Sequence, residues 1–292
     1  EVTVSGKTEV TYAGKADSTN GNKWGGGNAI TFSGSGDMNG MTATYTAVIG
    51  DGGQASSNTS ETFASSSLML DMGDMGTVGF DQGVGEFGVS TIDDKMPYAY
   101  EEIWTYTGAS NGLRAAGGSN VLGYKNTFAG YTLSVELDPG HSDSATSTKG
   151  GSGDGGNTGG DTTQSGYNWA LTGSPMDGMN VGIGAGKEEN QIATLDDETY
   201  ATGFVTYAVG GLTLGYQMSE GNGGTAAETS NNVEIYGASF AINDNLSISV
   251  NQMDNEFDKT AGTANVTEET NGIGISYTMG SASLRMLTAE TD

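Results

Sequence analysis

The residues best suited to chemistry lie in one segment, residues 83–119, whose composition differs from that of the rest of the chain. The segment is rich in aromatic and large apolar side chains, so we expect it to pack against the protein rather than extend into solvent. A ring of carboxylates in a narrow, water-filled passage favours cations. Paired carboxylates also offer the oxygen ligands that divalent cations prefer, which makes Asp93 and Asp94 the candidate ligands for a divalent cation. The acidic residues of the segment are Glu86, Asp93, Asp94, Glu101 and Glu102.

Two other motifs are weaker candidates. His141, Ser142 and Asp143 are consecutive, whereas a catalytic triad is assembled from residues that lie apart along the chain, so we expect no enzymatic activity. Residues 150–161, GGSGDGGNTGGD, have the composition of glycine- and aspartate-rich calcium repeats but lack their nonapeptide period. They fall within residues 139–166, which we expect to form a flexible loop. No cofactor is expected, and calcium is the one candidate.

Composition narrows the classes of function. The 292 residues include 50 glycines and no cysteine, so disulfides and thiolate metal sites are excluded. Acidic residues outnumber basic ones by 36 to 10, and the formal net charge of -26 would repel nucleic acid and attract cations. No apolar run approaches the roughly 20 residues that a membrane helix needs. A barrel strand spans a bilayer with about 10 residues of alternating pattern, so a membrane location stays open.

The elements that position these residues are expected to be strands, because apolar and polar residues alternate with a period of two almost throughout, in about 15 segments. In VTVSGKTEVTY, for example, Val4 and Val10 fall on one side and Lys7 and Glu9 on the other. Short turns rich in Gly, Asn and Asp alternate with long polar loops, which is the pattern of an up-and-down meander. A helix-free meander of this length is expected to close on itself, because an open sheet would expose two edges. The sequence therefore predicts one all-β barrel domain, residues 1–292.

The alternation also predicts which side of the barrel faces water. A barrel of about 15 or 16 strands is too wide for side chains to fill, so its lumen is expected to be wet. The small polar set suits that lumen, and the apolar set then faces lipid. In AVGGLTLGYQ, residues 208–217, we expect Gly210–Gly211 to form a periplasmic turn, Leu214 to face lipid and Gln217 to line the water. By the same phase, the basic residues that point inward are Lys7, Lys125 and Arg285.

Three stretches carry a resemblance to a known family. The start EVTVSG, MPYAYEE at residues 96–102 and SNVLGYKNTFAGYTLSVEL at residues 119–137 resemble Gram-negative general porins of the alphaproteobacterial type. The resemblance implies a transmembrane antiparallel barrel of about 16 strands in the outer membrane. Residues 83–119 would be its third loop, folded into the lumen as a constriction, and residues 139–166 an extracellular loop.

The resemblance also implies a function and partners. It implies a homotrimer, in contact with outer-membrane lipid and lipopolysaccharide, that passes ions and small hydrophilic solutes by passive diffusion. It further implies a basic wall opposite the acidic loop, and the candidates for it are Lys7, Lys125, Arg285 and Arg114, the last of which lies late in the loop. Because basic residues are so few, the predicted channel prefers cations.

One departure and two alternatives remain. Porins end in a strand that closes against the first, whereas this sequence ends at SLRMLTAETD after the fifteenth predicted strand. Either the closing strand is missing from the sequence, which we favour because the first strand would otherwise be unpaired, or the predicted number of strands is off by one. The main alternative is a non-transport surface or secreted β-protein, either an adhesin or a calcium-binding protein that uses its Gly/Asp-rich loops. A substrate-specific channel is a third hypothesis and differs only in the residues of the constriction.

Overall fold

The computed structural model describes residues 2–12, 24–50, 62–104, 113, 119–138, 165–189, 197–222, 228–259 and 264–292. Fifteen strands in these residues form a single sheet, and each strand is hydrogen-bonded to its neighbours along the chain. The strands are β1 (Val2–Tyr12), β2 (Trp24–Met38), β3 (Met41–Gly50), β4 (Thr62–Asp71), β5 (Thr77–Gln82), β6 (Ser119–Phe128), β7 (Tyr131–Asp138), β8 (Gly166–Met176), β9 (Met179–Glu188), β10 (Glu198–Val209), β11 (Leu212–Asn222), β12 (Glu228–Asn243), β13 (Leu246–Lys259), β14 (Val266–Met279) and β15 (Ala282–Thr291). Two short 3₁₀ helices, η1 (Gly73–Met75) and η2 (Gly88–Thr91), complete the regular structure. No helix in these ranges is both long enough and apolar enough to cross a bilayer.

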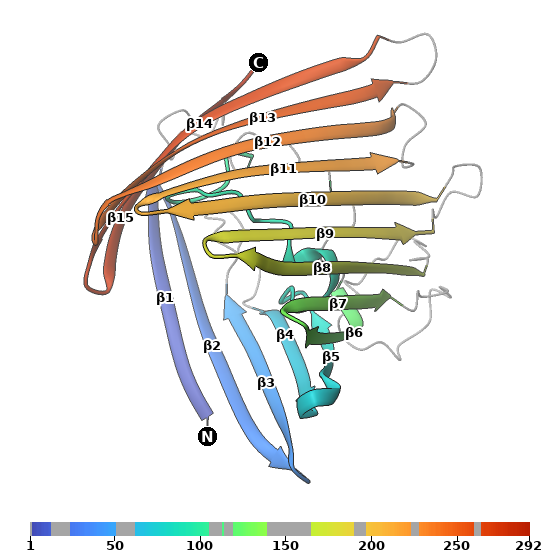
Figure 1. Ribbon diagram of the computed structural model, residues 1–292. Coiled ribbons are helices and arrows are strands. Elements are labelled where there is room, and N and C mark those ends of the chain that lie inside the picture. The colour runs from blue at the N-terminus through green and yellow to red at the C-terminus, as the bar shows by residue number, and fades with distance from the viewer. Residues whose placement is uncertain are drawn as a thin grey trace.

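The predicted antiparallel up-and-down meander is confirmed, since the strand order in the sheet is the order along the chain. Figure 1 shows that the sheet is strongly curved, with β1 to β3 on one side and β8 to β14 on the other. Among the described strands no pairing joins β1 to β15. The described residues between β5 and β6 contact the inner face of the curved sheet.

Short connections join the strands in pairs at one end of the sheet, as predicted. The turn between β2 and β3 consists of Asn39 and Gly40, both with positive φ (55° and 83°), and this backbone twist matches that of a hairpin. Ala129 and Gly130 repeat the arrangement between β6 and β7, with φ of 50° and 83°. The predicted turn at Gly210–Gly211 joins β10 to β11.

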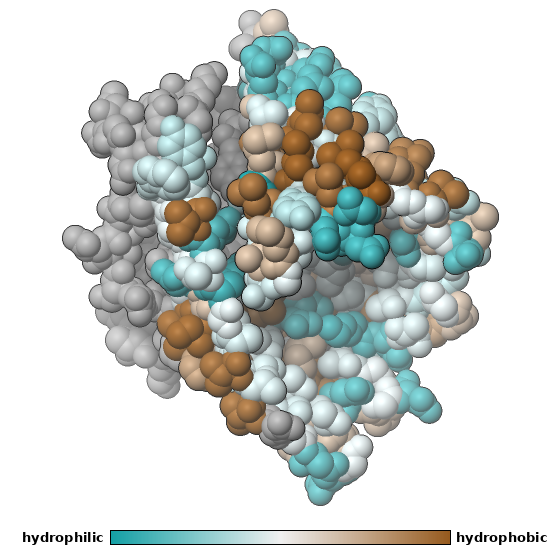
Figure 2. All heavy atoms as spheres, turned by 90° about the vertical axis from the view of Figure 1, so that its left-hand side faces the viewer, coloured by the Kyte–Doolittle hydropathy of each residue, from teal (hydrophilic) through white to brown (hydrophobic). Residues whose placement is uncertain are grey.

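The polarity of the sheet is the reverse of that in a water-soluble protein. Residues directly opposite in neighbouring strands point to the same face, so the register assigns every side chain to one side. Large apolar side chains dominate the outer face and are exposed, and Figure 2 shows such residues grouped on the surface. They include Val4, Ile30, Leu68, Leu122, Leu137, Ile183, Leu214, Val250, Ile273 and Leu284. The inner face instead holds buried polar residues, among them Ser67, Ser134, Asn168, Thr202, Ser219, Ser249 and Thr270.

An exposed apolar wall around a polar interior is the pattern of a barrel in lipid. Several strands are longer than a bilayer requires, and their polarity supports a location in lipid. β12 has 16 residues and β13 and β14 have 14 each, against the 9 to 11 that a tilted membrane strand needs. Their outward positions away from the short turns are polar, so these strands continue past the apolar band. The outward acidic residues of these strands include Glu234, Asp254 and Glu269, and Glu220 of the neighbouring β11 also faces outward.

The orientation of the two faces predicts an asymmetric response to a charged substitution. Replacing the lipid-facing Val250 by Lys should lower the free energy of unfolding by about 2–4 kcal/mol, because an ammonium would enter hydrocarbon. Lys at the inward-facing Thr213 is the matched control and should change stability by less than about 1 kcal/mol. Denaturant unfolding in lipid vesicles measures both, and equal losses in the two variants would contradict the assignment of the faces.

Candidate pore constriction

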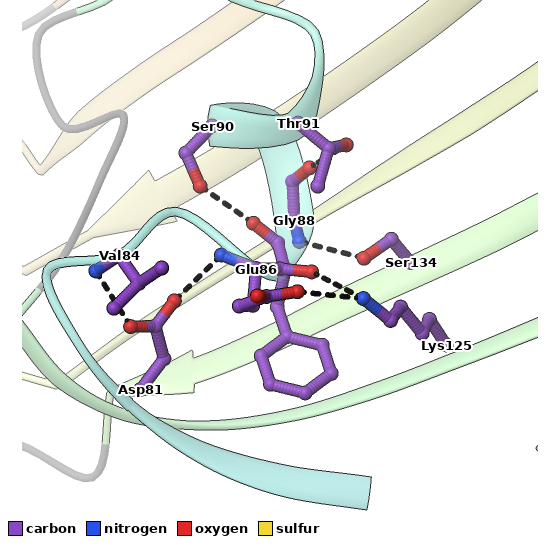
Figure 3. A network of polar contacts seen from close by, with 9 residues as sticks. Asp81, Val84, Glu86, Gly88, Ser90, Thr91, Lys125 and Ser134 are labelled. Atoms are coloured by element: carbon purple, nitrogen blue, oxygen red, sulfur yellow. Dashed lines mark hydrogen bonds and ion pairs between the residues drawn. The ribbon is translucent and has the colours of Figure 1, made fainter. Parts of the chain in front are cut away.

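Asp81 turns the chain inward at the end of β5. Its side chain is buried on the inner face, and Oδ1 accepts a hydrogen bond from the backbone N–H of Val84 at 2.7 Å. Oδ2 accepts another from the backbone N–H of Glu86 at 2.6 Å. Figure 3 shows that this one carboxylate holds the first turn of the loop. Asp81 precedes residues 83–119, the segment in which the acidic site residues were predicted.

Glu86 and Lys125 form an ion pair at the base of the loop. Lys125 Nζ lies 2.8 Å from Glu86 Oε2, and about a third of each side chain is exposed. The ammonium also lies 5.5 Å from the centroid of the Phe87 ring, a cation–π distance. Glu86 is therefore neutralised locally and stands apart from the other acids of the loop.

The next residues of the loop are held by polar side chains of the inner wall. The backbone N–H of Gly88 donates to Ser134 Oγ at 2.9 Å, and that of Val89 donates to Asn168 Oδ1 at 2.8 Å. Ser134 belongs to β7 and Asn168 to β8. These side chains supply partners to backbone groups that lie outside the sheet ladder, and buried backbone groups need such partners.

The second half of the loop continues along the wall toward β14. The backbone N–H of Ala99 donates to Ser249 Oγ at 2.9 Å, and Asn251 Nδ2 donates to the carbonyl of Pro97 at 3.1 Å. Farther on, the Tyr100 hydroxyl donates to Glu9 Oε1 of β1 at 2.8 Å. The loop thus follows the inner face over many strands and reaches the first one.

Glycines on the inner wall make room for the bulky residues of the loop. A Cβ at Gly123 would overlap the ring of Phe87, and one at Gly272 would overlap Ile103. Between these two, Gly184 faces Ile92 and both Gly215 and Gly237 face Pro97. Inward apolar residues add a patch for the loop to pack on: Val89, Ile92, Met96 and Ile103 of the loop form one buried cluster with Tyr200, Phe204, Val233, Ile235 and Met253 of the wall.

Gln217 departs from its predicted environment. It faces inward, as the phase predicted, but the loop covers it completely, so it is buried and does not line the water. Its Nε2 donates to Thr202 Oγ1 at 3.1 Å and lies 3.5 Å from the backbone carbonyls of Ile92 and Asp93. The alternation of a strand reports the face of a residue, but not what a distant loop places over it.

Four acids of the loop influence one another electrostatically. The pKa of Asp94 is raised to about 7, first by partial desolvation within the loop and then by the charges of Asp93, Glu102 and Glu101, although the side chain still reaches solvent. The pKa of Asp93 is raised chiefly by burial, and its own backbone and Lys95 oppose the shift. Burial and then Glu102 raise the pKa of Glu101. The fold therefore gathers these four carboxylates and leaves Glu86 separate.

The basic residues predicted to line the constriction do not form one group in the described part of the structure. Lys7 lies on the inward face of β1, opposite Ala29 in the register. The Arg285 guanidinium carbon lies 5.8 Å from the centroid of the Tyr100 ring, and Lys125 pairs with Glu86, so both residues contact the loop. Arg114 lies outside the described residues, as does most of the predicted loop 139–166. In the described ranges no group of three or more acidic, His or Cys side chains has a geometry that could hold a metal ion.

A curved antiparallel sheet, apolar outside and polar within, with an acidic segment along its inner wall, defines a transmembrane β-barrel channel. The family described as Gram-negative porin matches residues 1–286, and the chain belongs to that family. It is a porin of the outer membrane of a Gram-negative bacterium, as the resemblance implied. No curated protein is similar enough in sequence to count as a relative.

Solved porins share the fold. OmpF of Salmonella typhi, in complex with daunomycin, matches with a TM-score of 0.71 over 97% of this chain and 89% of its own, at 12% identity. A mutant of Rh. blastica porin matches with a TM-score of 0.67 over 99% of this chain and 94% of its own, at 13% identity. Another porin gives 0.64 over 100% and 95%, at 15% identity. These identities are low, so the likeness shows the fold alone, and that fold is the predicted barrel.

The close approach of Phe87 to the wall predicts the effect of filling the space at Gly123. Gly123→Val should displace the ring, lower the free energy of unfolding by about 1–3 kcal/mol and reduce single-channel conductance as the loop base moves into the lumen. Gly36→Val is the matched control, because nothing lies within 4 Å of a Cβ at that strand position. Unchanged conductance in Gly123→Val would show that Phe87 does not hold the loop in place.

The crowding of the loop carboxylates predicts an unusual titration. Because the folded-state pKa of Asp94 is raised to about 7, its carboxyl group should be neutral below that pH and gain its charge as the pH rises through it. Carbonyl ¹³C NMR of aspartate-labelled protein in micelles measures the midpoint, and the signal missing from Asp94→Asn assigns it. Neutralising Glu102 as Gln should move the midpoint down. A midpoint near the ordinary aspartate value of about 4 would contradict the geometry.

Proposed function

We propose that this porin passes ions and small hydrophilic solutes by passive diffusion and prefers cations. The observation that carries the proposal is the gathering of four carboxylates on one inner-wall segment: Asp93, Asp94, Glu101 and Glu102. Carboxylates fixed in a narrow aqueous passage raise the local concentration of cations and repel anions. The net charge of -26 acts in the same direction.

The placement of the basic residues supports a cation preference as well. Lys125 is paired with Glu86 and Arg285 lies over Tyr100, so their charges sit beside the loop rather than across the lumen from it. The opposing basic wall implied by the porin resemblance is correspondingly weaker. Calcium reaching the pore would compete with monovalent cations at Asp93 and Asp94.

We also propose a homotrimer in contact with outer-membrane lipid and lipopolysaccharide. The broad apolar outer face supports contacts with lipid and with other protomers. A detergent-resistant oligomer that dissociates on heating is the expected result in gel electrophoresis. An adhesin or calcium-binding surface protein, with no transport activity, is the competing function, and release from membranes by salt or chelator alone would favour it.

Reversal potentials in planar bilayers under a salt gradient test the cation preference. The wild-type channel should give a K⁺/Cl⁻ permeability ratio above unity, and the variant D93N/D94N/E101Q/E102Q should lower the ratio several-fold, because the charges in the passage are lost. The matched control, E220Q/E256Q/E269Q/E290Q, removes four carboxylates from the outer face and should leave the ratio close to wild type. Equal ratios in the two variants would overturn the role of the loop acids, and a chain that opens no channels would overturn the function itself.

A further inference from the structure

A second feature of the lumen lies on the side of the loop that faces the short turns. A cavity of about 530 Å³ opens there between the loop and the wall. Thr132 of β7, Ser174 of β8, Asn180 of β9 and Thr206 of β10 line it, and each of them lies toward the short-turn end of its strand. The cavity therefore lies on the short-turn side of the constriction, which is the side predicted to face the periplasm.

The charges in the cavity have the opposite sign to those of the loop acids. Lys95 and Lys125 both line it, against the single carboxylate of Glu86. The Glu86–Lys125 contact of 2.8 Å neutralises one ammonium and fixes its position. Lys95 is exposed, so its ammonium can turn toward a bound group. Among the lining residues the ammonium groups thus outnumber the carboxylates, while Lys95 also interacts with the charges of Asp93 and Asp94 outside the cavity.

The remaining lining is rich in groups that hydrogen-bond to hydroxyls. Thr91, Thr132, Ser134, Thr172, Ser174 and Thr206 contribute hydroxyl groups, and Asn180 contributes an amide. Several of these groups already have one partner: Thr91 Oγ1 donates to the carbonyl of Gly88, Ser134 Oγ accepts from the N–H of Gly88, Ser174 Oγ donates to Asn180 Oδ1, and Thr132 shares a hydrogen bond with Thr127. A hydroxyl can both donate and accept, so each keeps a capacity for a second bond, and the wall can pair with a solute that carries several hydroxyl groups. The volume falls in the range of small-molecule sites.

We propose that this cavity is a subsite for a small polyhydroxylated carboxylate, such as a sugar acid. Its carboxylate binds the ammonium of Lys95, beside the pre-positioned Lys125, and its hydroxyl groups bind the Thr, Ser and Asn side chains of β7 to β10. The proposal rests on the diffusion function and deepens it. The acidic stretch of the loop sets the sign preference for inorganic ions, while this subsite holds one class of organic anion that enters from the periplasmic side.

Gluconate is the probe, with glucose and glucosamine as its neutral and cationic counterparts of similar size. Added to the short-turn side in constant KCl, gluconate should reduce the K⁺ current through the wild-type channel at lower concentration than either counterpart. K95Q should raise the half-blocking concentration of gluconate about two- to fivefold, which is the effect expected from the loss of one exposed ion pair. K187Q is the matched control, since Lys187 lies on the outer face, paired with Asp197 at 2.7 Å, and it should leave the value unchanged.

The outcomes separate this proposal from the proposed function. A channel that conducts and prefers cations but responds equally to gluconate and glucose, or equally in K95Q and K187Q, overturns the subsite alone. Thr206→Val removes a lining hydroxyl at nearly constant volume and should weaken block by gluconate and glucose together. An unchanged response in Thr206→Val would overturn the role of the hydroxyl wall. A protein that opens no channels would defeat the proposed function first.

Discussion

Inside a bilayer no water is available to backbone N–H and C=O groups, and the rest of this structure depends on that constraint. It is met by one sheet in which fifteen strands pair with their neighbours in chain order. Pairing of this kind makes successive side chains alternate between lipid and lumen, so the apolar set must be outside and the polar set inside. The exposed Val4 and Leu284 and the buried Ser134 and Thr270 are consequences of the same rule.

The same need for partners explains why the constriction loop follows the wall. A loop that leaves the ladder brings unpaired backbone groups into the lumen, and the polar inner face supplies partners for them. Ser134, Asn168 and Ser249 each bind a loop N–H, while Asp81 binds two. Apolar packing then adds rigidity. Wall glycines such as Gly123 leave room for the aromatic rings of the loop to pack against the inner face. The aromatic composition of residues 83–104 is thus a consequence of where the loop lies.

The local pattern was enough to predict the strands, the short turns and the phase of each face. These features depend on residues close together in the sequence. Period-two alternation involves neighbouring residues, and the turn between β10 and β11 is formed by Gly210 and Gly211 alone. The contacts of the loop are not local: Ala99 and Ser249 are 150 residues apart, and Glu86 and Lys125 are 39 apart. For this reason Gln217 was predicted to line the water-filled lumen, and the role of Asp81 was not predicted. An acidic residue at the end of a strand, followed by the glycine-rich turn GVG, was the one available signal for Asp81.

Gathering carboxylates in a passage also limits the charge that they carry. Each added acid raises the pKa of its neighbours, and partial desolvation within the loop raises it further, so that the Asp94 carboxyl titrates near neutrality. Lys95 opposes this shift for Asp93 and Asp94, which lets the acids stay ionised at a closer spacing than they would otherwise reach. The same ammonium is exposed and lines the cavity on the short-turn side. An anion bound to Lys95 in the proposed subsite would reduce the stabilisation that this lysine gives to the carboxylates, so the proposal implies that occupancy of the cavity is coupled to the charge of the acidic stretch.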